Sequence, residues 1–275
     1  MNLFRAVQLQ TVDYCNRKCT FCPNNPIIRS RNLMSVALYV KILHNLKKLN
    51  YTGRFSPYLM NEPLMDPRLP ELIALARKFL PHSQIAINTN GDKIINSPNL
   101  IQTLKEAGLN ALLINIYTPE IKIEEVYKYI NSNKEITLLP ENEKILDRYM
   151  NDGRLYIRIR ELYRAPSYFW NRGGNVKNVK RSPKYRRPPP CDLIFKQIYI
   201  LWDGKAVLCC SDWQSEVVVG KFPDKSLEEI WQSEVYRVYR NAHCSGEISK
   251  LKLCSKCDRI SHTLSINEEG SFLCK

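Results

Sequence analysis

The chain repeats a pattern in which a short apolar run, often alternating with polar residues, precedes a longer segment with apolar residues at helical spacing. A period of two indicates a strand, and apolar residues three and four positions apart indicate one face of a helix. The pattern predicts strands at residues 3–12, 53–60, 84–88, 111–117 and 155–162. It predicts helices at residues 33–49, 69–80 and 98–107, after Thr118–Pro119, and at residues 141–150.

Helix-starting and helix-ending residues support these boundaries. Asp66–Pro67 and Ser97–Pro98 each combine a capping side chain with a proline suited to the first turn, and Gly108 suits a helix end. The face expected to be buried on the helix at 33–49 is formed by Leu33, Val36, Val40, Leu43 and Leu46.

Strand and helix alternate along residues 1–185, which we expect to form one domain. This alternation is typical of an α/β fold with a parallel sheet and right-handed crossovers. The units are too few for a closed eight-stranded barrel, so we expect a partial (β/α)6 barrel of the TIM type. In such barrels the functional side chains lie at the carboxyl ends of the strands. Those positions hold Cys15, Asn61–Glu62, Asn90–Gly91 and Asn115.

A smaller second domain is expected at residues 186–275, after a stretch with little periodicity that ends in three prolines. Residues 196–201 and 205–208 are strand-like, and Asp203–Gly204 between them is a hairpin signal. Ser226 with Glu229 forms a capping box that predicts a following helix.

Composition limits the class of protein. The chain has 275 residues, 44% of them hydrophobic, which is enough for a sizeable core. We find neither an apolar run long enough to span a membrane nor a signal-peptide pattern, so we expect a cytoplasmic protein without a membrane partner. In that compartment ten clustered cysteines are metal ligands rather than a disulfide scaffold.

The net charge of +14 is unevenly distributed. Residues 1–190 hold 30 Lys and Arg against 15 Asp and Glu, whereas residues 191–275 hold 11 against 12. The excess is largest between Arg154 and Arg187, where Glu161 is the single acid. Such a concentration indicates an anionic partner, although a solvated basic surface is the alternative for residues 177–187.

The strongest chemical signal is Cys15–Asn16–Arg17–Lys18–Cys19–Thr20–Phe21–Cys22, which follows the first predicted strand. Three cysteines without a fourth nearby leave one iron of a four-iron cluster open to a cofactor. Zinc binding or plain burial of the cysteines is the alternative. The stretch resembles the signature of the radical S-adenosylmethionine (SAM) superfamily. The resemblance implies a [4Fe-4S] cluster on Cys15, Cys19 and Cys22 that binds SAM and forms a 5′-deoxyadenosyl radical.

The same resemblance assigns roles to residues at the other strand ends. Asn61–Glu62–Pro63 stands where the family often has Gly-Gly-Glu, so Glu62 is expected to bind the amino group of SAM. Phe21 is expected against the adenine. Asn61 and Asn90 are also expected at the cofactor. Asn115 is a candidate for the ribose, with a structural hydrogen bond as the alternative.

The strand at 155–162 places Arg158 and Arg160 on one face together with Tyr156. If this face points into the barrel, the arginines need an anion, which the cofactor carboxylate or the substrate could supply. The alternative is an outward, solvated face. Arg172 is a candidate for contacting a substrate hydroxyl, and a surface arginine is the alternative reading.

The C-terminal cysteines resemble the twitch domain, a shortened form of the SPASM extension that some members carry. The resemblance implies one auxiliary [4Fe-4S] cluster, with zinc on the same thiolates as the alternative. A second auxiliary cluster is not expected, because residues 258–273 contain no cysteine. The expected ligands are Cys191, Cys209, Cys254 and Cys257, and the remaining cysteines are Cys210, Cys244 and Cys274.

Enzymes of this build oxidise a secondary alcohol, epimerise aminoglycoside sugars or modify peptides. We expect an alcohol-oxidising enzyme that uses the auxiliary cluster as electron acceptor, acts on an anionic small molecule and receives electrons from flavodoxin or ferredoxin. An epimerase with Cys210 or Cys244 as hydrogen donor, and a peptide-modifying enzyme, are the alternatives within the family. A non-enzymatic nucleic-acid-binding metalloprotein would leave Glu62 without a use, so no nucleic-acid partner is expected.

Overall fold

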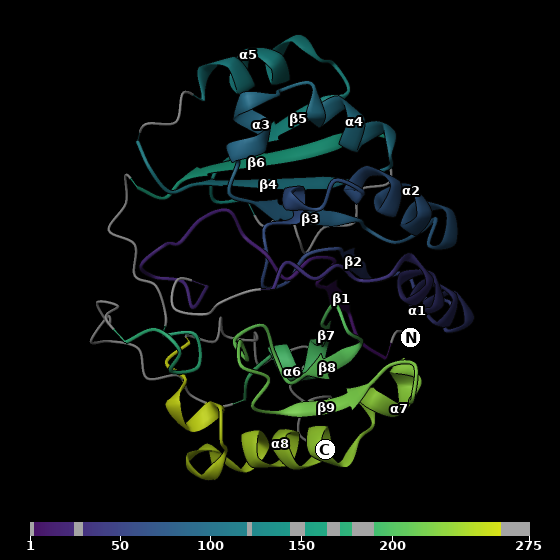
Figure 1. Ribbon diagram of the computed structural model, residues 1–275, viewed down its shortest axis with the longest axis vertical. Coiled ribbons are helices and arrows are strands. Elements are labelled where there is room, and N and C mark those ends of the chain that lie inside the picture. The colour runs from purple at the N-terminus through teal and green to yellow at the C-terminus, as the bar shows by residue number, and fades with distance from the viewer. Residues whose placement is uncertain are drawn as a thin grey trace.

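The structure is a computed structural model that describes residues 3–24, 30–119, 123–143, 152–163, 171–177 and 190–259. Its strands form a four-stranded sheet with the order β3-β4-β6-β5 and a five-stranded sheet with the order β2-β1-β7-β8-β9 (Figure 1). The strands are β1 (Ala6–Leu9), β2 (Arg54–Ser56), β3 (Ala86–Thr89), β4 (Ala111–Ile116), β5 (Ile136–Leu139), β6 (Leu155–Glu161), β7 (Gln197–Ile200), β8 (Lys205–Val207) and β9 (Val218–Lys221).

Parallel pairing dominates both sheets. Every neighbouring pair in the β3-β4-β6-β5 sheet is parallel, and β1 pairs in parallel with both β2 and β7. A parallel bridge between Phe55 and Ile85 connects β2 to the start of β3. The strands therefore form a curved, mostly parallel wall, which confirms the expected α/β class and its partial barrel.

The helices pack their apolar faces on the outer side of this wall (Figure 1). Among the helices that the structure describes, none has the length and hydrophobicity needed to cross a bilayer. They are α1 (Val36–Lys48), α2 (Leu69–Phe79), α3 (Asp92–Asn96), α4 (Leu100–Glu106), α5 (Glu124–Ser132), α6 (Leu193–Lys196), α7 (Leu227–Trp231) and α8 (Glu234–Ser245), with 3₁₀ turns η1 (Pro63–Met65), η3 (Ile248–Lys250) and η4 (Cys254–Lys256).

Two details of the helices differ from the expectation. The side chains that α1 buries are Tyr39, Ile42, Leu43 and Leu46. Leu33 and Val36 are 44% and 45% exposed; Leu33 lies before α1, and Val36 is the first residue of the helix. The N-cap position of α2 is Arg68 rather than Asp66, whose carboxylate accepts hydrogen bonds from the NH and the side chain of Arg68.

The sequence pattern missed β5 and β9. Both have four residues, and β5 lies at a sheet edge, where pairing with β6 through the main chain needs no strong apolar alternation. The chain adds β5 outside β6, so the spatial order departs from the chain order. Of the helix expected at residues 141–150, positions 141–143 are not helical and the remainder lies outside the described residues.

The C-terminal hairpin is joined to the barrel by a parallel pairing. Residues of β7 pair with β1 from Ala6 opposite Gln197 to Leu9 opposite Ile200, and β7 then turns into β8 at Gly204. The expected capping box at Ser226 and Glu229 is confirmed. The expected domain division between residues 185 and 186 lies outside the described residues and stays a prediction.

Gly204→Ala should destabilise the protein by several kcal/mol. Gly204 has a φ of +85°, and a Cβ there would lie 2.1 Å from the Phe222 carbonyl oxygen. Positive φ and backbone overlap each cost about 1–3 kcal/mol. Gly153→Ala is the matched control, because its φ is +79° but no heavy atom lies within 4 Å of the added Cβ. Anaerobic thermal melting should show a larger loss for Gly204→Ala, and equal losses would contradict the steric argument.

Candidate active site

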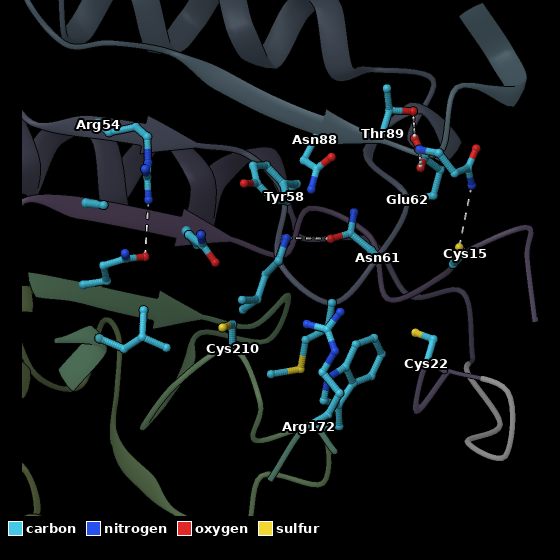
Figure 2. Close-up of a pocket in the computed structure, with 18 of the residues that line it drawn as sticks. Cys15, Cys22, Arg54, Tyr58, Asn61, Glu62, Asn88, Thr89, Arg172 and Cys210 are labelled. Carbon is cyan, nitrogen blue, oxygen red and sulfur yellow. Dashed lines mark hydrogen bonds between the residues drawn. The ribbon is translucent and has the colours of Figure 1, made fainter. Parts of the chain in front are cut away.

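A cavity of about 860 Å³ lies inside the barrel wall (Figure 2). Its lining side chains come from the loop after β1, from strands β2, β3 and β6, and from the C-terminal segment. The cavity thereby brings together residues from almost the whole length of the chain.

All three cysteines of the loop after β1 line this cavity. Cys15, Cys19 and Cys22 are partly exposed, and none of the three is in a disulfide. The Cys22 backbone NH donates to the Cys19 carbonyl at 3.0 Å, and the Arg17 NH lies 3.5 Å from the Cys15 sulfur. Burial raises the pKa of the Cys15 thiol to about 11. A metal must therefore displace a proton when it binds this sulfur.

A hydrogen-bonded network fastens this loop to the turn after β3. The Arg17 Nε donates to Asp92 at 2.8 Å, and the pair forms a salt bridge. The Asn16 amide donates to the same carboxylate at 2.6 Å, while the Asn90 amide donates to Asn16 at 2.8 Å. The position of the cysteine loop therefore depends on a carboxylate 75 residues away in the chain.

Glu62 lies beside the cysteine loop with its carboxylate held in a fixed orientation. It accepts hydrogen bonds from the Thr89 hydroxyl at 2.6 Å, the Asn90 NH at 2.7 Å and the Leu64 NH at 3.1 Å. Only 4% of the residue is exposed. Burial raises the pKa of Glu62 to about 7, although these hydrogen bonds oppose the shift. An ammonium group placed here would favour the ionised carboxylate.

Of the two residues expected at the adenine and the ribose, Phe21 lines the cavity and Asn115 does not. Phe21 lines the cavity and packs against Tyr117, with ring centroids 5.1 Å apart. Asn115 is buried and is not among the lining residues; its amide donates to Asn88 at 2.6 Å. Asn88 is the residue of this pair that lines the cavity. No pattern in the sequence singles it out.

Arg158 lines the cavity, whereas Arg160, two residues further along β6, does not. The Arg158 Nη1 donates to the Glu143 carbonyl at 2.6 Å. Burial, followed by the nearby charge of Arg160, lowers the pKa of Arg158. Asn61 also lines the cavity, and its side-chain oxygen accepts the Leu59 NH at 2.9 Å.

The C-terminal segment contributes Arg172 and Cys210 to the cavity, and both are labelled in Figure 2. Arg172 has a positive φ of 51°, in a turn that Asn171 holds by donating to the Lys256 carbonyl at 2.7 Å. Cys244 lies elsewhere, on α8, where it is exposed and disulfide-bonded. Cys274 lies outside the described residues.

None of the four expected auxiliary ligands is among the lining residues, although Cys210, the neighbour of Cys209, is. Cys191 and Cys209 are buried. Burial, and then the nearby thiols Cys210, Cys191 and Cys254, raise the pKa of Cys209. Cys257 follows in a tight turn, where its NH donates to the Cys254 carbonyl at 3.2 Å.

The comparison with protein families agrees with this geometry. The family model of the Radical SAM superfamily matches residues 9–151, which is more than half of the chain. The model of the SPASM iron–sulfur cluster-binding domain matches residues 191–258. The chain therefore belongs to the radical SAM superfamily.

Particular relatives cover almost the full chain. The S-adenosyl-L-methionine-dependent 2-deoxy-scyllo-inosamine dehydrogenase of Niallia circulans is 24% identical over 94% of both chains. The GTP 3′,8-cyclase of Clostridium acetobutylicum is 28% identical over 94% of this chain and 77% of its own length. Among solved structures, BtrN in complex with AdoMet and 2-DOIA has a TM-score of 0.74 at 22% identity and covers 94% of both chains.

The residues present fit the groups that the two families imply, namely SAM with a [4Fe-4S] cluster and an auxiliary iron–sulfur cluster. The donor set consists of free thiols, which suit iron–sulfur clusters. Among the described residues, no three His, Cys, Asp or Glu side chains gather as closely as a single metal ion such as zinc needs. Which cysteines bind which cluster stays a prediction.

Replacing Cys15, Cys19 and Cys22 together with alanine should halve the bound iron and abolish release of 5′-deoxyadenosine. Two four-iron clusters give about eight irons in the anaerobically reconstituted protein, and the variant should retain about four. Iron and zinc analysis of both proteins measures this. Stoichiometric zinc with only about four irons in the unchanged protein would contradict an auxiliary iron–sulfur cluster.

Asp92→Asn should loosen the cysteine loop without removing a cysteine. The substitution keeps an acceptor for Asn16 but removes the charge that pairs with Arg17. Discounted for partial exposure, the pair contributes about 1 kcal/mol, so the rate at which a chelator removes the iron should rise about fivefold. Asp152→Asn is the control, because Asp152 bonds Tyr156 on the exposed surface. A removal rate equal to that of the control would rule out the anchoring role.

Proposed function

We propose that this protein is a radical SAM dehydrogenase that oxidises a secondary alcohol of a sugar, cyclitol or nucleotide-type small molecule to a ketone. The observation that carries the proposal is the single cavity in which the cysteine loop and Glu62 face Cys210, the neighbour of the auxiliary cysteine Cys209. Further support is the likeness to 2-deoxy-scyllo-inosamine dehydrogenase over 94% of both chains.

Each side chain has a role that its position allows. When bound, SAM and the clusters supply both a radical, which takes a hydrogen atom from the substrate, and an acceptor for the electron that is left behind. Glu62 binds the amino group of SAM through a carboxylate already oriented by three donors. Phe21 and Tyr117 pack against each other on one side of the cavity and exclude water from the reacting carbon of the substrate. The protein thus orients and encloses the reactants, while the cofactor provides the reactive species.

Arg172 contacts the substrate hydroxyl in this proposal. The hydroxyl bears the proton that must leave when the alcohol becomes a ketone. The Asn171 amide fixes the Arg172 turn against the auxiliary segment, and the Asn171 NH donates to Asp258 at 2.6 Å. The guanidinium is therefore tied to the part of the chain that carries Cys254 and Cys257.

This chemistry requires an electron donor and a reducing environment. A low-potential donor, flavodoxin or ferredoxin, reduces the cofactor-binding cluster. The cytoplasm supplies the reducing conditions that thiolate ligands need. Residues 1–185 form the cofactor-binding barrel and residues 186–275 the auxiliary domain.

An epimerase is the second candidate, and one observation favours it. Cys210 places a thiol on the cavity wall, where it can return a hydrogen atom to a substrate radical. Cys244, also considered for this role, is exposed and disulfide-bonded on α8. The choice therefore depends on Cys210 alone.

Cys210→Ala separates the two reactions. A dehydrogenase needs no thiol donor, so the variant should keep its iron, form 5′-deoxyadenosine and release a product two mass units lighter than the substrate. An epimerase should still form 5′-deoxyadenosine but lose its product of unchanged mass. Mass spectrometry of both products measures this, with Cys244→Ala as the matched cysteine control. Loss of the epimer specifically in Cys210→Ala would overturn the dehydrogenase proposal.

A further inference from the structure

The cavity continues beyond the cofactor end, along the inner face of β1, β2 and β7. Ala6 lies in register with Arg54 on one side and with Gln197 on the other. Because the alanine methyl is short, the Arg54 Nη2 reaches across it to the Gln197 Oε1 at 3.3 Å. Figure 2 shows Arg54 at the opposite end of the pocket from Cys15, with Tyr58 and Asn61 between them.

The walls between these ends carry hydrogen-bond donors without acceptors. The Arg158 Nε and the Asn61 Nδ2 are buried, and among the described residues neither has a hydrogen-bond partner. Both side chains use their other atoms, since Arg158 binds the Glu143 carbonyl and Asn61 accepts from Leu59. Leaving a buried donor without an acceptor is unfavourable, so these atoms indicate a ligand that supplies oxygen acceptors.

The charges of the side chains that line the cavity also indicate a ligand with oxygen acceptors. The cavity wall has Glu62 and Asp192 as its acids against a larger set of cations. Arg17 and Arg259 are paired with carboxylates. The lining also includes Arg158, together with Arg5, Arg54, Arg172 and Lys196, each of which has interactions of its own.

Arg158 is the clearest of these cations. Within the described residues it forms no salt bridge, and it lies close enough to Arg160, Tyr58 and Glu141 to interact electrostatically with each of them. The Tyr58 hydroxyl in turn lies within electrostatic reach of both Arg54 and Arg158. Like charges that face one low-dielectric space repel unless an anion lies between them.

We propose that the space bounded by Tyr58, Asn61 and Arg158, with Arg54 at its far end, binds a phosphate group of the substrate. A phosphate monoester carries about 1.5–2 negative charges near neutral pH and presents three acceptor oxygens. It therefore matches several cations and donors better than a single carboxylate does. A volume of about 860 Å³ is near the upper end of the usual range for ligand cavities, which leaves room for a cofactor and a second small molecule. The inference rests on the proposed function and narrows its substrate to a phosphorylated alcohol.

Equilibrium binding tests the site without turnover. Inorganic phosphate is titrated calorimetrically into the anaerobically reconstituted protein saturated with SAM. Arg158→Gln should weaken phosphate binding at least tenfold. Asn61→Asp should do so as well, because it keeps the acceptor for Leu59 but turns an unpaired donor into a repelling carboxylate. Arg237→Gln is the matched control, since Arg237 is an exposed arginine on α8 paired with Glu234, and its binding should equal that of the unchanged protein.

Two outcomes overturn the site. One is phosphate binding that is absent from the unchanged protein or equal in all four proteins. The other is a loss of SAM affinity in Arg158→Gln as large as the loss of phosphate affinity, because the arginine then holds the cofactor carboxylate.

A second measurement separates this inference from the proposed function. Sugar and cyclitol phosphates should raise 5′-deoxyadenosine release and yield ketones, whereas their unphosphorylated parents should not. Ketone from the parent alcohols alone would sink the phosphate site and leave the dehydrogenase standing. Phosphate binding that follows the arginine pattern in a protein that never cleaves SAM would reject the dehydrogenase and leave an anion site.

Discussion

The arrangement of the active site depends on the hydrogen bonds and the salt bridge that the Asp92 carboxylate forms. The loop of Cys15 to Cys22 contains no helix or strand that would fix it by repeated main-chain hydrogen bonds. Asp92 holds it by pairing with Arg17 and Asn16, and Asn90 extends the contact to the turn after β3. The same turn donates to Glu62 through Thr89 and Asn90. One short segment therefore sets the cysteine loop and Glu62 relative to each other.

Local patterns predicted most of the elements and the chemically distinctive residues. The strands β1, β2, β4, β6, β7 and β8 fall within the expected ranges, and β3 extends one residue past its range to Thr89. Glu62 lies beside the cysteine loop as its place at a strand end predicts. The salt bridge between Arg17 and Asp92 was not predictable, because it joins residues 75 positions apart and neither side chain belongs to a periodic pattern. Likewise, the position of Asn115 at a strand end made it a ribose candidate but could not reveal that its amide donates to Asn88, one strand away.

The electrostatics of the barrel differ between its two ends. At the end that holds the cysteine loop, the Glu62 carboxylate is satisfied by three donors. Among the lining side chains, cations outnumber acids, and within the described residues Arg158 and Asn61 each keep a buried nitrogen without a hydrogen-bond partner. The lining thus combines one carboxylate held by three donors with an excess of positively charged side chains.

The pairing of β7 with β1 gives the C-terminal segment a place in the barrel sheet itself. Four consecutive residue pairs, from Ala6 with Gln197 to Leu9 with Ile200, join the strand that leads into the cysteine loop to the strand that leads into Cys209. The auxiliary segment is therefore not an interchangeable module. A chimaera that exchanged it between relatives would also have to match the edge of β1, so the two cluster-bearing regions are constrained to diversify together.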